Sequence, residues 1–166
     1  MKQKQLSIGG LLNIIFSKIN FIMGRGFHYN IRKDKTYFMT MTVEDWIDLF
    51  TCVNQKQLIV DSLKYCQENK GLNIFGWCLM PSHLHLIANT KIPWDKNHAI
   101  ELYTERVTWQ KLNYIHRNPV VDKVVYKEQD YLFSLARNYY GLPNVLEIDC
   151  LTPPVTTVSS RNFFNT

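Results

Sequence analysis

The stretch that decides the fold is Leu72-Asn-Ile-Phe-Gly-Trp-Cys-Leu-Met80, followed by Pro81-Ser82 and then His83-Leu-His-Leu-Ile-Ala88. Its first part is apolar and aromatic, the Pro-Ser pair interrupts it, and the last part resumes a strand pattern. Two consecutive strands joined by a turn predict a hairpin. Alternation along the second strand places His83 and His85 on one face and Leu84 and Leu86 on the other.

The residues before this hairpin predict a strand and two helices. Residues 36–42 are rich in β-branched and aromatic side chains, which is typical of a strand. Thr42 and Asp45 have the spacing of a capping box, so a short helix should follow, with one apolar face formed by Trp46, Ile47 and Phe50. Asn54 followed by Gln57 offers a second helix start, and Gly71 ends that helix, whose apolar positions are Ile59, Leu63 and Cys66.

Two further helices are predicted after the hairpin. Residues 101–118 have a helical composition with an apolar stripe, and Pro119 should end this helix because proline has no N–H to donate. The stripe consists of Thr108, Leu112 and Ile115. Residues 130–141 predict a last helix. This order of strands and helices indicates an α+β fold, in which helices pack on a small antiparallel sheet.

Length and composition limit the classes of protein that this chain can be. Its 166 residues suit one domain, at roughly 100–200 residues per domain. With 46% hydrophobic and 20% charged residues, the composition excludes a disordered, collagen-like or coiled-coil protein. The net charge of +5 permits an acidic partner such as nucleic acid. Four cysteines without a C-x-x-C pair favour reduced thiols and a cytoplasmic location.

The two ends of the chain differ from its centre. Residues 11–23 are apolar and follow two lysines, as in a signal peptide, but Asn13, Ser17 and Lys18 interrupt them and they are too short to span a bilayer. We therefore expect residues 1–22 to be a disordered or spurious extension, with Met23 as the start of a domain over residues 23–150. The Pro- and Ser/Thr-rich residues 151–166 predict a disordered tail. We expect no membrane partner.

The paired histidines could bind a metal ion. Two neutral imidazoles on one face of a strand converge on one point, and histidine is the commonest metal ligand. Five histidines nevertheless produce such a pair by accident in roughly one chain of this size in eight. His83 and His85 alone therefore also fit an ordinary surface or core pair.

A second group of polar residues precedes Pro119. Tyr114 and Asn118 lie ~40° apart on a helix, away from the apolar stripe, so the phenol could act as a nucleophile. A tyrosine that only packs its ring at the helix edge explains the same pattern. Arg117 lies ~60° from Tyr114 and could pair with a phosphate, whereas His116 points elsewhere and is interpreted as structural. Asn97 and Arg137 could contact DNA, although capping or solvation also accounts for both.

Three segments together resemble the REP-associated tyrosine transposases, which belong to the single-tyrosine HUH superfamily. They are residues 77–86 (WCLMPSHLHL), 111–120 (KLNYIHRNPV) and 131–141 (YLFSLARNYYG), and the resemblance covers about residues 23–151. It implies a ferredoxin-like, RRM-like fold and a nickase and strand transferase for single-stranded or hairpin DNA, active as a monomer or homodimer. It implies Tyr114 as the nucleophile that forms a 5′-phosphotyrosine, with Mg²⁺ or Mn²⁺ held by His83, His85 and Asn118.

The chain departs from the family pattern at two places. Ser82 stands where the family usually has asparagine, and a serine can still make a hydrogen bond in the turn. Relatives carry a helical insert after the histidine strand, whereas here Ala88 is followed almost directly by Trp94. A core helix and part of the DNA-binding surface could be missing. Two alternatives therefore stay open, namely an inactive DNA-binding remnant and a metal-dependent hydrolase that uses water.

Overall fold

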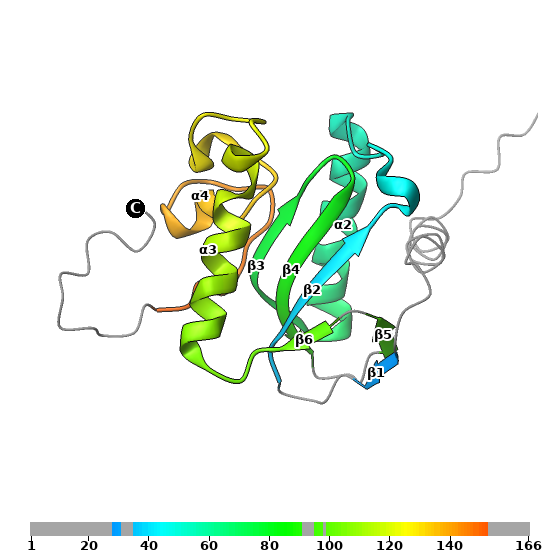
Figure 1. Ribbon diagram of the computed structural model, residues 1–166, viewed down its shortest axis with the longest axis vertical. Coiled ribbons are helices and arrows are strands. Elements are labelled where there is room, and N and C mark those ends of the chain that lie inside the picture. Colours follow the sequence, from blue (N-terminus) through cyan, green and yellow to red (C-terminus); the bar gives the residue numbers. More distant parts are fainter. Residues whose placement is uncertain (1–27, 31–34, 91–94, 98, 153–166) are drawn as a thin grey trace, which may run out of the picture.

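The computed structural model describes residues 28–30, 35–90, 95–97 and 99–152 (Figure 1). The predicted extension 1–22 lies outside these residues, and so does the predicted tail except for residues 151–152. None of the described helices combines the length and the apolar composition that a membrane crossing requires. All four cysteines are free thiols.

A four-stranded antiparallel sheet forms the centre of the molecule. The predicted hairpin is confirmed as β3 (Leu72–Leu79) and β4 (His83–Thr90), and the predicted first strand is β2 (Tyr37–Thr42). β2 pairs with β4 on one side and with β6 (Ala99–Glu101) on the other, so the strand order is β3-β4-β2-β6. A separate pair joins β1 (His28–Asn30) to β5 (Asp95–Asn97).

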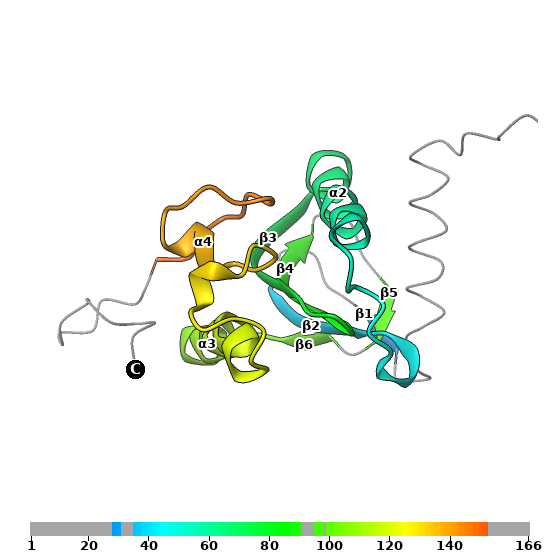
Figure 2. The ribbon, with the colours of Figure 1, turned by 90° about the horizontal axis from the view of Figure 1, so that it is seen from above.

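Two long helices cover the two faces of this sheet. Helix α2 (Val53–Lys70) lies on one side of the strands and α3 (Glu105–Val121) on the other (Figure 2). Alternation along β4 divides its side chains between these faces, and Leu84 and Leu86 are buried in the core. The predicted α+β fold, a small antiparallel sheet with helices packed on it, is therefore confirmed.

The shortened connection after the histidine strand still completes the sheet. β4 and β6 both run antiparallel to β2, so they are parallel to each other, and residues 91–98 connect them. Such a crossover normally takes about a dozen residues or more. The strand that follows this short connection is also short, since β6 pairs only with Tyr37, Phe38 and Met39 of β2.

Helix α2 matches its prediction except at its start. The capping residue is Cys52 rather than Asn54, because the Cys52 N–H donates to the Gln55 side-chain oxygen (3.3 Å) and closes a capping box two residues earlier. The helix ends as predicted at Gly71, whose φ of 62° is left-handed. The predicted apolar positions are buried, namely Ile59, Leu63 and Cys66.

The short helix predicted after Thr42 is wrong. Thr42 is the last residue of β2, opposite His83, and its capping box with Asp45 does not form. Only a 3-10 turn, Glu44–Trp46, follows, because Asp45 and Trp46 both have left-handed φ angles (58° and 56°) that cannot continue a helix. Of the predicted apolar face only Phe50 is buried, whereas Trp46 and Ile47 are exposed.

The bounds of helix α3 also need correction. It begins at Glu105 instead of residue 101, because Glu101 belongs to β6 and the Thr104 hydroxyl caps the helix by accepting from the Val107 N–H. Pro119 does not end it, and the helix continues to Val121. Proline removes a single hydrogen bond here, and the next turn is held by the Asp122 N–H, which donates to the Asn118 carbonyl (3.0 Å).

The predicted last helix, 130–141, is wrong over most of its length. A 3-10 turn (Glu128–Asp130) comes first, and only Ala136–Tyr139 forms the short helix α4. The residues between them run along the outer edge of β3, where the Leu79 N–H donates to the Phe133 carbonyl (2.9 Å) and the Leu135 N–H to the Trp77 carbonyl (2.8 Å). Pairing with this otherwise unpaired edge overrides the helical composition.

Helix α3 approaches the sheet closely at Gly76 of β3. A Cβ at this position would lie 2.7 Å from the Leu112 Cδ2 atom, and Leu112 is completely buried. Since real Cβ atoms do not come this close to a neighbour, the missing side chain sets the distance between helix and sheet. The closeness of α3 to the face that carries the two histidines therefore depends on Gly76.

We predict that Gly76→Ala destabilises the protein by about 1–3 kcal/mol, because the new methyl group would meet the buried Leu112 side chain and force it to shift. Urea unfolding measures this loss. In a double-mutant cycle with Leu112→Ala, the two substitutions should cost less together than the sum of their separate effects, since the smaller side chain makes room for the new methyl group. Strictly additive losses would contradict the proposed contact.

Candidate active site

The two histidines lie side by side on the face of the sheet that α3 covers. The register places His83 opposite Thr42, and His85 opposite both Thr40 and Cys78. Their ring centroids are 4.6 Å apart and both side chains are largely buried. The alternation predicted from the sequence is confirmed, and it brings the two imidazoles together in space.

Each imidazole has one nitrogen engaged by a neighbouring hydroxyl. The Thr40 Oγ1 atom lies 2.9 Å from Nδ1 of His85, and the Ser82 Oγ atom lies 3.2 Å from Nδ1 of His83. Within the described part of the chain, the buried Nε2 of His85 has no hydrogen-bond partner. This is the arrangement of ligating histidines, whose second nitrogen is oriented by a polar neighbour. Ser82, the departure from the family pattern, thus contacts the pair.

Burial keeps the two imidazoles neutral. Desolvation is the main cause that lowers the pKa of His85 to about 3, and the neighbouring His83 and Lys111 act in the same direction. Desolvation also lowers the pKa of His83, although the carboxylates of Asp122 and Asp48 oppose this shift. Because a metal ion competes with a proton for the same lone pair, neutral rings can bind a cation near pH 7 without first losing a proton.

Tyr114 projects from α3 next to this pair. Its ring centroid lies 5.2 Å from that of His85, and its side chain is 52% exposed. Phe38 fills the space beside them, since it stacks on His85 (5.6 Å between centroids, 25° between planes) and meets Tyr114 edge-on (6.2 Å). Tyr114 is therefore accessible from solvent and adjacent to the imidazoles, as the proposed role of nucleophile requires.

Asn118 lies one turn further along the same side of α3. It is 7% exposed, and its Nδ2 atom is buried without a hydrogen-bond partner among the described residues. Two neighbours place it close to the imidazoles. Tyr114, one turn before it, contacts His85, and Asp122, one turn after it, is near enough to His83 for its carboxylate to oppose the lowering of that histidine's pKa. Asn118 therefore lies between two turns whose residues are near the imidazoles, and its side-chain oxygen is the atom that would bind a cation.

The residues present therefore fit a divalent cation, but with a minimal set of ligands. His83, His85 and Asn118 provide two nitrogens and one amide oxygen, all neutral. Among the residues that the structure describes, no group of three or more His, Cys, Asp or Glu side chains is placed to hold a metal. An ion at this site would thus need oxygen ligands from outside the protein, such as water or phosphate.

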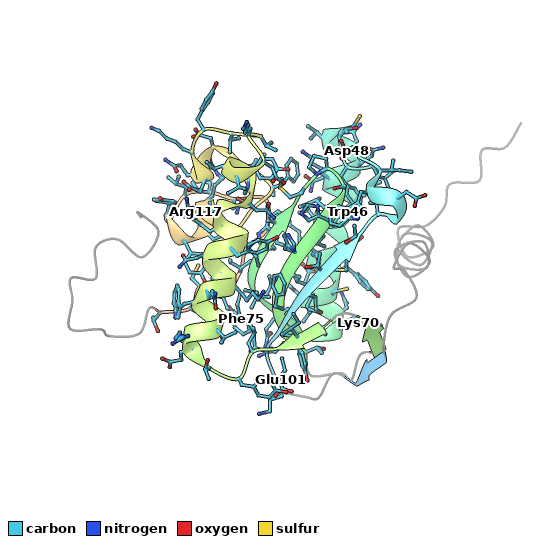
Figure 3. The ribbon with its side chains drawn as sticks, viewed as in Figure 1. Trp46, Asp48, Lys70, Phe75, Glu101 and Arg117 are labelled. Carbon is cyan, nitrogen blue, oxygen red and sulfur yellow. The ribbon has the colours of Figure 1, made fainter. Side chains whose placement is uncertain are left out.

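The residues predicted to contact DNA lie in different surroundings. Arg117 is exposed on α3 (Figure 3). Arg137 is half-buried, and its Nε and Nη1 atoms donate to the backbone carbonyls of Pro143 (2.7 Å) and Gln129 (3.2 Å), which holds two loops together. Asn97 pairs with His28 through β5, and its side chain lies outside the described part of the structure. Their DNA contacts stay predictions.

The structural role of His116 agrees with its surroundings. Its ring is completely buried and stacks on Tyr140 with 6.0 Å between the centroids. Burial is the main cause that lowers the pKa of His116 to about 4. The imidazole is therefore neutral in the folded protein near pH 7, and it points away from the reactive group formed by Tyr114 and the histidine pair.

We predict that His116 makes the folded state sensitive to acid. Its pKa falls from an ordinary value of about 6.5 to about 4 on folding, so stability is complete above pH ~6.5 and declines as the pH falls towards ~4, by up to about 3 kcal/mol. Urea unfolding at several pH values should show that His116→Phe removes this part of the decline. An unchanged pH dependence in the variant would contradict the assignment.

Sequence reasoning missed several neighbours of the site. Thr40 and Phe38 reach it only through strand pairing, which no local sequence pattern specifies. Lys111 stands three residues before Tyr114, and helical spacing could have identified it. Trp46 is 64% exposed and meets the His83 ring edge-on, with 5.6 Å between centroids (Figure 3). Its position follows from the left-handed turn that sequence reasoning predicted to be a helix.

Comparison with known proteins identifies a similar solved structure. No protein-family model and no curated protein sequence matches the chain. A structure described as the REP-associated tyrosine transposase bound to a REP hairpin matches with a TM-score of 0.55 and 18% identity, over 82% of this chain and 100% of the other. This likeness shows the fold, and that fold is the one that the resemblance of the three sequence segments implied.

Proposed function

We propose that this protein is a transposase-type nickase and strand transferase that acts on single-stranded or hairpin DNA through a 5′-phosphotyrosine. The observation that carries the proposal is the position of Tyr114. Its phenol is exposed, and its ring centroid lies 5.2 Å from that of His85, which belongs to a buried and neutral histidine pair. A similar structure is described as a transposase bound to a REP hairpin, which supports DNA as the partner.

The reaction assigns Tyr114 the role of nucleophile. Its hydroxyl oxygen attacks a backbone phosphorus, the bond from that phosphorus to the 3′ oxygen breaks, and the 3′ oxygen leaves as a hydroxyl after it takes up a proton. The DNA 5′ phosphate stays on the tyrosine. Because one phosphodiester replaces another, the reverse step can rejoin the strand without ATP. A phenol has an ordinary pKa of about 10, so attack requires that its proton be removed.

In this proposal His83, His85 and Asn118 hold Mg²⁺ or Mn²⁺. When bound, such an ion polarises the phosphate and offsets the charge that develops during attack. The two imidazoles favour Mn²⁺, because the harder Mg²⁺ prefers oxygen ligands. Thr40 and Ser82 orient the rings through Nδ1, and Phe38 fixes His85 by stacking on it. These residues position the ligands in the folded protein before DNA arrives.

We predict that Tyr114→Phe abolishes a covalent adduct that the parent protein forms. Incubation with labelled hairpin DNA and Mn²⁺ should yield a protein–DNA species that survives denaturing electrophoresis. Tyr103→Phe is the matched control, because Tyr103 is also exposed but precedes α3, and it should leave the adduct intact.

Two other results of this assay would overturn the proposal. DNA binding without any adduct in the parent protein would identify an inactive, DNA-binding remnant. Strand cleavage that persists in Tyr114→Phe would identify a hydrolase that uses water as its nucleophile.

We predict that Thr40→Val weakens Mn²⁺ binding by about 10- to 100-fold, because it removes the hydroxyl that orients His85. Isothermal titration calorimetry measures this affinity without relying on activity. Thr108→Val is the control, since the Thr108 hydroxyl donates to the Thr104 carbonyl at the start of α3. Equal affinities in the parent and in Thr40→Val would show that this hydrogen bond does not support a metal ligand.

A further inference from the structure

Lys111 lies beside the candidate nucleophile, with its charge held against two aromatic rings of the site. It is half-buried on α3, and its Nζ atom is 4.6 Å from the ring centroid of Phe38 and 5.9 Å from that of Tyr114. Phe38 in turn stacks on His85. The ammonium group therefore belongs to the same cluster of side chains as the proposed nucleophile and one proposed metal ligand.

Helical geometry aligns Lys111 with the rest of the site. Lys111, Tyr114 and Asn118 are spaced i, i+3 and i+7, which at 100° per residue places all three within ~60° of one another. Tyr114 stands in the middle of this stripe, with the Lys111 cation on one side and the buried amide of Asn118 on the other. A DNA backbone that presents a phosphate to Tyr114 would thus pass close to Lys111.

The charges of the site favour an anion next to Lys111. The three proposed metal ligands are neutral, and in the described residues no carboxylate forms an ion pair with Lys111. Its charge is near enough to His85 to help lower the pKa of that ring. A cation held against two aromatic rings and left without an acidic partner is suited to a phosphate, whose non-bridging oxygens accept hydrogen bonds from an ammonium group.

We propose that Lys111 is a phosphate-binding residue of this site, whose ammonium group contacts a non-bridging oxygen of the DNA backbone phosphate next to Tyr114. This inference rests on the proposed function and adds a residue to it. The contact holds the phosphate against the nucleophile. It also compensates negative charge on the side of Tyr114 that is remote from Asn118.

The test measures how DNA binding depends on salt in protein that cannot react. Binding of a fluorescent oligothymidylate to Tyr114→Phe is followed by anisotropy over a range of NaCl concentrations. Lys111→Met is then added to this variant, because methionine keeps an unbranched side chain over Phe38 but has no charge. It should weaken DNA binding several-fold. It should also reduce the slope of log K against log salt concentration by about 0.7, which is the value for one phosphate contact on a single strand. Lys111→Arg should retain the slope.

Lys64→Met is the matched control. Lys64 is exposed on α2, which covers the opposite face of the sheet, so this substitution should leave the slope unchanged. An unaltered slope in Lys111→Met would overturn the inference and leave Lys111 a packing residue. If that variant unfolds, the inference is tested instead by acetylating the lysine side chains of the parent protein with and without oligothymidylate. Oligothymidylate should protect Lys111 and not Lys64, and equal acetylation of Lys111 with and without DNA would overturn the inference.

The two proposals fail in different ways. A parent protein that forms the tyrosine adduct, while its Lys111→Met form keeps the full salt slope, would retain the proposed function and lose the phosphate contact. A reduced slope in Lys111→Met, with no adduct in the parent protein, would retain the phosphate contact on a DNA-binding protein and lose the proposed chemistry.

Discussion

The pairing register between β2 and β4 is the constraint on which the candidate site depends. It sets Thr40 opposite His85, so that both side chains face α3 and the threonine hydroxyl meets the imidazole. A slip of one residue would turn both histidines towards α2 and bring Leu84 and Leu86 to the α3 face. Burial of these leucines in the core opposes such a slip, and the hydrophobic core thereby fixes the chemistry of the opposite face.

The second constraint is the distance between α3 and the sheet. Because β3 has no side chain at Gly76, Leu112 can pack directly on the strand, and the same helix holds Tyr114 next to His85. The same close packing removes water from the imidazoles and keeps them neutral near pH 7. One geometric feature thus supplies both the proximity of the phenol and the protonation state that a metal ligand requires.

The short connection between β4 and β6 lies outside the elements that carry the site. The two histidines come from the interior of the sheet, and the tyrosine comes from a helix that packs on it, whereas residues 91–98 lead to the outer strand β6. The residues around the site also differ in their burial. The histidines and Asn118 are buried, while Tyr114 and Trp46 are exposed, so solvent reaches the phenol more readily than the imidazole rings.

The sequence by itself determined the hairpin, the face shared by His83 and His85, and the helical spacing of Tyr114 and Asn118, because strand and helix periodicity are local properties. Local signals failed at residues 42–50 and 130–141, where pairing with neighbouring backbone outweighs helical composition. Only the tertiary structure decided that Thr40 and Phe38 join the site and that Lys111 lies against Phe38. Strand register and helix packing bring these residues together from distant parts of the chain, and neither is encoded in any short segment.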